Sequence, residues 1–327
     1  MEMFDRQIRV FGKAGQRALQ KLIVGIVGAG GIGSLIFMLL VRLGVIQIII
    51  IDDDDVEKSN LNRLAGSTLS DAQNKTPKVL MLERRAKEIN RHIEVIPVQK
   101  SILEEDAQQQ LKMCDVFFGC TDNQSSRWEQ NRISAEYLIP YFDTGTGIKA
   151  DADLNIEHAG GQVRVVIPGM GCLNCINGID MSIAQQEKLP EPERQVAIKL
   201  GYIDGADIHA PAVASLNGVI ANLAVTEFMA FATGFKPLNR YIFYDFLNAL
   251  VVPLAFDKNP RCFTCSHLGS LAIGDKGKHL PTEMLINELK PQTHTNGAQN
   301  ANRKNKPETV NSKIINHSRT KRTGYRR

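Results

Sequence analysis

Glycines that could cradle phosphate groups lie between two apolar segments near the start of the chain. Residues 28–33 read Gly-Ala-Gly-Gly-Ile-Gly, directly after the apolar run 22–28 and before a second apolar run. Glycine lets backbone N–H groups approach a phosphate closely, and the N-terminus of a following helix supplies positive potential. The candidate phosphate-binding residues are Gly28, Gly30, Gly31 and Gly33. A tight strand-to-helix turn that requires a positive φ explains the same glycines without any ligand.

An acidic run ends the next apolar segment, about 20 residues after the glycine cluster. Asp52 is the first residue of this run, and Asp54 lies within it. A carboxylate in this position can accept hydrogen bonds from the hydroxyls of a ribose. At this stage, NAD and ATP are equally compatible with the pattern.

Three charged residues further along the chain favour ATP. Arg63 closes the sequence Ser-Asn-Leu-Asn-Arg, Lys78 lies in Lys-Thr-Pro-Lys-Val, and Asp122 lies in Cys-Thr-Asp-Asn. The two cations can neutralise the β- and γ-phosphates, and the carboxylate can hold Mg²⁺ through oxygen. Each residue also has an ordinary interpretation, since charged side chains are commonly solvated and Asp122 can cap a helix that starts near Ser125. A nicotinamide site requires no such second set of phosphate-directed cations.

Two Cys-x-x-Cys pairs predict a metal site. Cys172 and Cys175 form the first pair, and Cys262 and Cys265 form the second. Four thiolates complete a closed tetrahedral shell for Zn²⁺, which is the pattern of a structural rather than a catalytic site. A thioredoxin-like redox pair is the alternative, but neither pair opens a helix after a strand. We therefore expect zinc to join the start of the second half of the chain to its end.

The elements that would position these residues alternate between strand and helix. We expect buried strands at 22–28, 47–51, 93–98, 115–119 and 140–144, with helices at 32–43, 72–90, 104–112 and 125–137. This alternation predicts a doubly wound, Rossmann-like α/β fold with a mostly parallel sheet.

The second half follows a different pattern. We expect a strand at 163–167, a long surface loop at 177–205, a helix at 209–234 introduced by Pro211, and a terminal hairpin formed by 241–246 and 250–256. These last strands extend the sheet in antiparallel fashion. Residues 275–327 have the composition of a disordered tail.

Length and composition limit the class of protein. The chain has 327 residues, of which 43% are hydrophobic and 23% charged, which excludes a disordered or fibrous protein as a whole. The net charge of +4 is uneven, because residues 276–327 contain 12 Lys and Arg against three acidic residues. This basic tail has a single aromatic residue, so nucleic-acid binding is not favoured. The apparent lack of a membrane span or a signal peptide predicts a soluble cytoplasmic protein.

The combined motifs resemble those of the ubiquitin-activating-enzyme-like superfamily, in particular its bacterial ThiF/MoeB/HesA-type branch. The resemblance covers roughly residues 4–267 and rests on the glycine cluster, the acidic strand end, the Arg63 and Lys78 segments, the Cys-Thr-Asp-Asn turn and both cysteine pairs. It implies an adenylyltransferase that uses MgATP to adenylate the C-terminal glycine carboxylate of a ubiquitin-like or sulfur-carrier protein. Opposing hypotheses are an NAD-dependent oxidoreductase and a non-catalytic scaffold subunit.

The resemblance also implies roles for individual residues. Asp52 would bind the ribose, with Asp54 in the same nucleotide site, and Asp122 would bind Mg²⁺. Contacts with the triphosphate would come from the residues Gly28–Gly33, Asn60, Arg63 and Lys78. Arg6 matches a family arginine that reaches the ATP site of a partner subunit, which implies a homodimer. Residues 1–21 would then form a segment that reaches this partner, and residues 22–274 the adenylation domain, with a crossover loop at about 177–209.

The chain departs from the family pattern at the catalytic cysteine that many relatives carry. Residues 176–211 contain no cysteine, and the remaining thiols are Cys114 and Cys120. We therefore expect the enzyme to stop at the acyl-adenylate, which a thiol- or sulfur-bearing acceptor protein would intercept. Two other hypotheses concern this loop: an ester formed on Ser182 or Tyr202, and a contact between His209 and the substrate tail.

Overall fold

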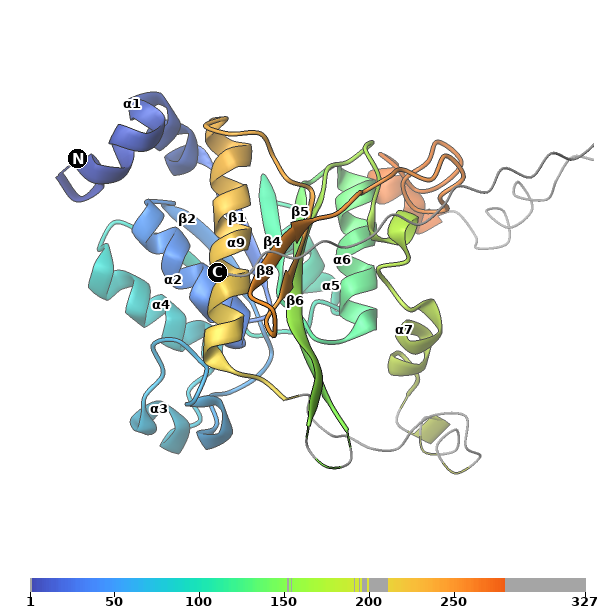
Figure 1. Cartoon of the computed structure of the whole chain (residues 1–327), viewed down its shortest axis with the longest axis horizontal. Helices are drawn as coiled ribbons and strands as arrows, with labels where there is room; N and C mark the ends of the chain where they lie inside the picture. Colours follow the sequence, from blue (N-terminus) through green and yellow to red (C-terminus); the bar gives the residue numbers. More distant parts are fainter. Residues whose placement is uncertain are drawn as a thin grey trace, which may run out of the picture. The chain divides into compact units, whose positions relative to one another are not determined.

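The computed structural model describes residues 2–279, apart from 152, 154, 191, 194, 196–198 and 200–210. An eight-stranded sheet in the order β3-β2-β1-β4-β5-β6-β7-β8 forms its centre (Figure 1). The five parallel strands are β1 (Ile23–Val27), β2 (Gln47–Ile51), β3 (Glu94–Val98), β4 (Val116–Gly119) and β5 (Tyr141–Ala150). The antiparallel strands are β6 (Ile156–Val166), β7 (Tyr241–Asp245) and β8 (Leu250–Pro253). The predicted mostly parallel sheet with C-terminal antiparallel strands is confirmed.

Helices cover both faces of this sheet (Figure 1). One apolar cluster draws on α1 (Asp5–Lys21), α2 (Gly31–Leu43), α4 (Lys78–Ile89) and α9 (Ala214–Thr233). The other draws on α5 (Glu105–Leu111), α6 (Gln124–Tyr137) and α7 (Met181–Glu187). In β2, Ile48 and Ile50 join the first cluster while Ile49 and Ile51 join the second. Alternate side chains of a strand point to opposite faces, so a run of isoleucines is what a sheet covered on both sides requires.

The sheet order places a topological switch point at the nucleotide motifs. The chain leaves β1 toward β2 on one side, whereas β4 pairs with β1 on the other side. The connections after β1 and β4 therefore diverge at the carboxyl edge, where ligands of open α/β sheets bind. The glycine cluster follows β1, and Asp122 follows β4.

The single helix predicted at 72–90 is wrong, because two helices occupy this region. α3 (Leu69–Gln73) ends at Asn74, and α4 begins only at Lys78. Between them, Lys75 adopts a φ of 47° and Pro77 precedes the first residue of α4. A proline removes a backbone donor and disfavours the helical conformation of the residue before it, so the break follows from the sequence.

Two further boundaries differ from the predictions. The loop expected at 177–205 contains the helix α7, which begins where the Asp180 side chain accepts hydrogen bonds from the backbone N–H groups of Ser182 and Ile183. The helix expected from His209 begins at Ala214, and His209 itself lies outside the described residues.

One described helix is long and apolar enough to cross a membrane, which the sequence analysis did not anticipate. This helix is α9, and half of the apolar window lies buried inside the protein. Its buried side chains include Ile220, Ala224 and Phe228, and they belong to the apolar cluster that also contains α2. Packing against the sheet accounts for its composition.

The predicted tail begins with ordered contacts. Residues 274–279 form a 3-10 helix, and Asp275 accepts hydrogen bonds from Lys112 and from the hydroxyl of Tyr137. Residues 275–279 therefore belong to the described structure. The rest of the tail lies outside the described residues.

Candidate functional site

The glycine cluster forms a close-packed turn between β1 and α2. Gly28 has a φ of 94°, and a Cβ added there would lie 2.8 Å from the backbone oxygen of Cys120. A Cβ on Gly33 would lie 1.8 Å from the carbonyl oxygen of Gly28, so packing alone requires these two glycines. Gly30 differs, because a Cβ there would meet no atom within 4 Å. Open space at Gly30, the residue that precedes α2, leaves room for a ligand at the helix N-terminus.

Two long side chains approach the same turn at Gly31. A Cβ on Gly31 would lie 2.3 Å from Nδ2 of Asn217 and 3.5 Å from Cδ of Arg63. Asn217 comes from α9 and accepts a hydrogen bond from the hydroxyl of Thr146 at 3.1 Å. Sequence reasoning missed Asn217, since no local motif distinguishes one asparagine in an apolar helix. The structure thus brings Arg63 to the predicted phosphate turn.

The segment that carries Arg63 is held by its own short-range hydrogen bonds. Arg63 Nη1 donates to the carbonyl oxygen of Ser59 at 2.8 Å and to Oδ1 of Asn62 at 3.0 Å. Asn60 Oδ1 accepts a hydrogen bond from the backbone N–H of Glu57 at 3.1 Å. The Asn60 side chain therefore organises this turn.

Lys78 lies between the two predicted carboxylates. Its Nζ is 2.6 Å from Oδ2 of Asp54 and 3.5 Å from Oδ1 of Asp52. A short antiparallel bridge between Asp55 and Pro77 places them there, and the backbone N–H of Lys78 donates to the carbonyl oxygen of Asp54. Asp52 also accepts a 2.6 Å hydrogen bond from the backbone N–H of Ala29 in the glycine turn.

Burial and charge act in opposite directions on these groups. Burial raises the pKa of Asp52 above its ordinary value of 3.8, and it outweighs the Lys78 charge and the two N–H donors. Burial alone would lower the pKa of Lys78, but the carboxylates of Asp52 and Asp54 outweigh it, and the pKa of Lys78 is raised. Both pKa values are raised, which favours the neutral form of Asp52 but the charged form of Lys78, because the ammonium lies beside two carboxylates. Lys78 is thus a buried cation beside the glycine turn, and the two carboxylates favour its charged form.

Asp122 borders a large cavity and does not cap the following helix. The N-cap of α6 is Asn123, whose side chain accepts a hydrogen bond from the backbone N–H of Ser126 at 2.8 Å. The capping interpretation of Asp122 is therefore wrong. The cavity has a volume of about 840 Å³ and extends from Ile32, Thr121 and Asp122 along the β5–β6 hairpin.

A buried cationic cluster, which sequence reasoning missed, lies beside Asp122. Arg127 lines the cavity and donates from Nε to Oδ1 of Asp143 at 2.8 Å and from Nη2 to the carbonyl oxygen of Thr121 at 3.2 Å. Arg164 of β6 donates from Nε to the other oxygen of Asp143 at 2.7 Å. Only the strand pairing of β5 with β6 brings Asp143 and Arg164 together, so no sequence spacing reveals the cluster.

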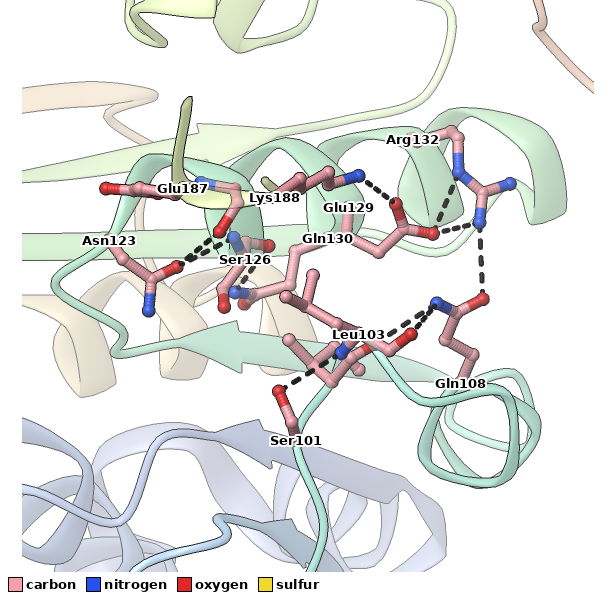
Figure 2. Close-up of polar contacts among 12 residues, drawn as sticks. Ser101, Leu103, Gln108, Asn123, Ser126, Glu129, Gln130, Arg132, Glu187 and Lys188 are labelled. Atoms are coloured by element: carbon pink, nitrogen blue, oxygen red, sulfur yellow. Dashed lines mark hydrogen bonds and ion pairs between the residues drawn. The ribbon is translucent and has the colours of Figure 1, made fainter. Parts of the chain in front are cut away.

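The end of α7 is fixed to the start of α6 (Figure 2). Glu187 Oε2 accepts a hydrogen bond from the backbone N–H of Ser125 at 2.6 Å. Lys188 forms an ion pair with Glu129 at 3.4 Å and lies 4.8 Å from the ring centroid of Trp128. The carboxylate at the helix N-terminus and the paired charges hold α6, and with it the Asp122 turn, against the α7 segment.

The four predicted metal ligands converge. The sulfur atoms of Cys172, Cys175, Cys262 and Cys265 all lie within 4.8 Å of one another. Tetrahedral Zn²⁺ with bonds of about 2.3 Å needs sulfur atoms roughly 3.8 Å apart, so this arrangement is compatible with a zinc site. The first pair follows β6 and the second follows β8.

The two remaining thiols do not have the character of nucleophiles. Burial raises the pKa of Cys114 to about 12 and that of Cys120 to about 12. A thiol must ionise to attack a carbonyl or phosphoryl group, so both remain protonated near neutral pH.

The other predicted residues are either exposed or outside the described residues. Arg6 is exposed on α1, near the residues that hold this helix to its own chain. Gln7, for example, donates to the carbonyl oxygen of Leu43 at 2.6 Å. Ser182 lies in the first turn of α7, whereas Tyr202 lies outside the described residues.

Comparisons with known proteins agree with this architecture. Molybdopterin-synthase adenylyltransferase of Escherichia coli K12 is 28% identical over 272 residues, covering 81% of this chain and 96% of the relative. The sulfur carrier protein ThiS adenylyltransferase of the same strain is 30% identical over 177 residues, covering 53% and 66%. Ubiquitin-like modifier-activating enzyme 5 of Drosophila virilis is 24% identical over 249 residues, covering 73% and 57%. The chain thus spans less than two thirds of the length of the latter two relatives.

Solved structures show the same fold. The crystal structure of E. coli MccB with ATP superposes with a TM-score of 0.64 at 20% identity, covering 81% of this chain and 75% of that one. The names of the sequence relatives support adenylyltransferase activity. A family model described as "ThiF family" matches residues 4–264, and this chain accordingly belongs to the ThiF family of the ubiquitin-activating-enzyme-like superfamily.

Proposed function

We propose that this protein uses MgATP to adenylate the C-terminal glycine carboxylate of a ubiquitin-like or sulfur-carrier protein, with release of pyrophosphate. The observation that carries the proposal is the convergence of three groups at the carboxyl edge of the sheet. The glycine turn after β1 binds Asp52, the partner of the buried Lys78, and lies close to the backbone of Cys120 and Thr121, which lead into Asp122 after β4. Glycine turn, cation and acid are what a triphosphate and its metal ion require.

Each group has a task in this reaction. The turn at Gly30 offers backbone N–H groups and open space to the phosphates, while Lys78 and Arg63 neutralise negative charge. Asp52, one of whose oxygens already accepts from Ala29, can accept from a ribose hydroxyl. Asp122 would hold Mg²⁺, which neutralises triphosphate charge when it is bound. Attack of a carboxylate on the α-phosphorus brings two anions together, so charge neutralisation and alignment are the main requirements.

The cavity beyond Asp122 is the proposed path of the carrier tail. Its walls include Gly145, Gly147, Gly160 and Gly161 of the β5–β6 hairpin. Glycine walls leave room for a narrow peptide, so the C-terminal tail of the carrier could lie along them with its terminal glycine beside Asp122. Because the thiol pKa of both Cys114 and Cys120 is raised to about 12, we propose that neither forms a thioester and that the acyl-adenylate is passed directly to a thiol- or sulfur-bearing acceptor.

The proposal also includes the oligomeric state of the protein and a structural zinc ion. We propose a cytoplasmic homodimer in which Arg6 of one protomer reaches the ATP site of the other, and a structural Zn²⁺ on the four cysteines. The exposure of Arg6 and the convergence of the sulfur atoms support these assignments.

Exchange of labelled pyrophosphate into ATP tests the function. We expect exchange only when a cognate carrier with a C-terminal diglycine is present, because the reverse reaction requires the acyl-adenylate. A parallel assay for NAD⁺ reduction addresses the oxidoreductase hypothesis. Absence of exchange with every candidate carrier, together with NAD⁺ reduction, would contradict the proposal.

A further inference from the structure

The buried cluster beside Asp122 contains more positive than negative charge. Asp143 is 1% exposed and accepts hydrogen bonds from Arg127, from Arg164 and, at 2.8 Å, from the hydroxyl of Tyr141. Burial alone would raise the pKa of Asp143, but the two arginines outweigh it, and the pKa lies below its ordinary value. One ionised carboxylate, that of Asp143, is therefore the shared ion-pair partner of two guanidinium groups.

An excess buried charge is costly unless an opposite charge joins it. The exposed fraction of Arg127 is 8% and that of Arg164 is 3%, so water screens neither strongly. A pair formed by Asp143 and Arg164 alone would be neutral, which makes Arg127 the surplus cation. Asp122 is the nearby acid whose charge acts on Arg127, and this acid is the proposed Mg²⁺ ligand. Surplus charge in such a position is typical of binding sites for anions.

The cavity gives an anion access to Arg127. Of the two arginines, Arg127 lines the cavity and Arg164 is not among the lining residues. A Cβ added to Gly145 would lie 3.5 Å from Nη2 of Arg127, and one added to Gly147 would meet no atom within 4 Å. The absence of side chains at these two positions leaves the guanidinium open toward the β5–β6 hairpin.

Ion pairs and hydrogen bonds of Glu129 and Arg132 hold the helix that carries Arg127 (Figure 2). Glu129 pairs with Lys188 and with Arg132, and Arg132 also donates to the side-chain oxygen of Gln108 at 3.3 Å. Arg127 itself is held by Asp143 and by the carbonyl oxygen of Thr121. Because these two contacts fix the orientation of the guanidinium group, Arg127 is preorganised for a ligand of fixed geometry.

We infer that Arg127 binds the terminal carboxylate of the acyl substrate and holds it for attack on the α-phosphorus of ATP. This inference rests on the proposed function. One carboxylate oxygen would accept from Arg127, while the other forms the new O–P bond and the bond from the α-phosphorus to pyrophosphate breaks. The guanidinium offsets repulsion between the carboxylate and the phosphates and transfers no proton.

Two synthetic peptides test the contact directly. Both end in Gly-Gly, one with a free carboxylate and one with a C-terminal amide, and their affinities for the full-length protein are measured by calorimetry with a non-hydrolysable ATP analogue and Mg²⁺. We expect the wild type to prefer the carboxylate peptide by about tenfold or more, the usual value of a charge-assisted hydrogen bond. In Arg127→Gln this preference should disappear, while the affinity for the ATP analogue stays within about twofold.

Arg164→Gln is the matched control, because it removes the other guanidinium from the same Asp143. It should retain the preference for the carboxylate, and Arg127→Lys, which keeps the charge, should retain part of it. Circular dichroism and metal content establish whether each variant folds. The comparison of the two peptides on the wild type does not depend on any variant.

Equal affinity of the wild type for both peptides, or no binding of either at millimolar concentration, overturns the inference. So does a preference that survives in Arg127→Gln, or a loss confined to ATP affinity, which would assign Arg127 to the phosphates. A different result concerns the proposed function alone: an Arg127-dependent preference without pyrophosphate exchange for any carrier would leave the carboxylate site standing and remove the adenylation assignment.

Discussion

At the scale of single residues, the ion pairs of Lys78 join the glycine turn to the acidic strand end. Lys78 contacts Asp52 and Asp54, and Asp52 in turn binds the backbone of Ala29. We expect Lys78→Met to lower carrier-dependent pyrophosphate exchange by about 100-fold or more, since the variant loses a preorganised cation. Lys75→Met is the matched control, because Lys75 is exposed three residues earlier and should retain activity. Equal losses in the two variants would contradict the role of Lys78.

Asp122 and Asn123 are adjacent residues with separable roles. Asn123 caps α6 and Asp122 does not. We therefore expect Asp122→Ala to abolish pyrophosphate exchange without lowering the melting temperature. Asn123→Ala should lower the free energy of unfolding by about 1 kcal/mol, the usual cost of a lost N-cap. Thermal melts and exchange assays on both variants check this division, and an unfolded Asp122→Ala protein would refute it.

Ionisation of Asp143 should make the stability of the folded protein depend on pH in the acid range. Its folded pKa lies below the ordinary value of 3.8, so its stabilising effect is present above that value and is lost as the pH falls toward the folded pKa. Urea unfolding between about pH 5 and pH 3 should show a steeper loss of stability for the wild type than for Asp143→Asn. At neutral pH the variant should be less stable by on the order of 3–5 kcal/mol, because a buried pair loses one partner. If the free energy of unfolding fell equally with pH in the wild type and in Asp143→Asn, Asp143 would not be the group responsible.

At the scale of elements, the β5–β6 hairpin forms much of the cavity wall. The two strands are longer than predicted and pair from Tyr141 to Ala150, with Gly147 opposite Gly160. A side chain at Gly147 meets no neighbour, so Gly147→Val should fold normally but narrow the cavity. We expect the variant to raise the KM for the carrier at least tenfold and to leave the KM for ATP unchanged. An unchanged carrier KM would show that the tail takes another path.

At the scale of the whole molecule, the four cysteines connect segments about 90 residues apart in sequence. Removal of zinc with a chelator should lower the melting temperature by on the order of 10 °C, which corresponds to several kcal/mol for a domain of this size. Cys172→Ala should release the metal and reproduce this loss. Cys114→Ala, which removes a buried sulfur elsewhere, should keep the metal and cost less. Wild-type protein that binds no metal would refute the structural site.

The sequence alone determined the order of the strands in the first half, the glycine turn and the pairing of the cysteine motifs. These features depend on local patterns: apolar runs for strands buried on both faces, glycine where a Cβ would clash, and short ligand spacings. The sequence did not predict the break at Pro77 or the helix α7, whose cap at Asp180 is a weak local signal within a polar segment.

Only the tertiary structure decided which side chains surround the cavity. Asn217 reaches the glycine turn from a distant helix, and Arg127, Asp143 and Arg164 meet because α6, β5 and β6 pack together. Their separation in sequence carries no periodic signal. The tertiary structure also decided which residue caps α6. The side chains of Asp122 and Asn123 can accept the same hydrogen bond, so only their position relative to the first helical turn distinguishes them, and the backbone places Asn123 at the N-cap.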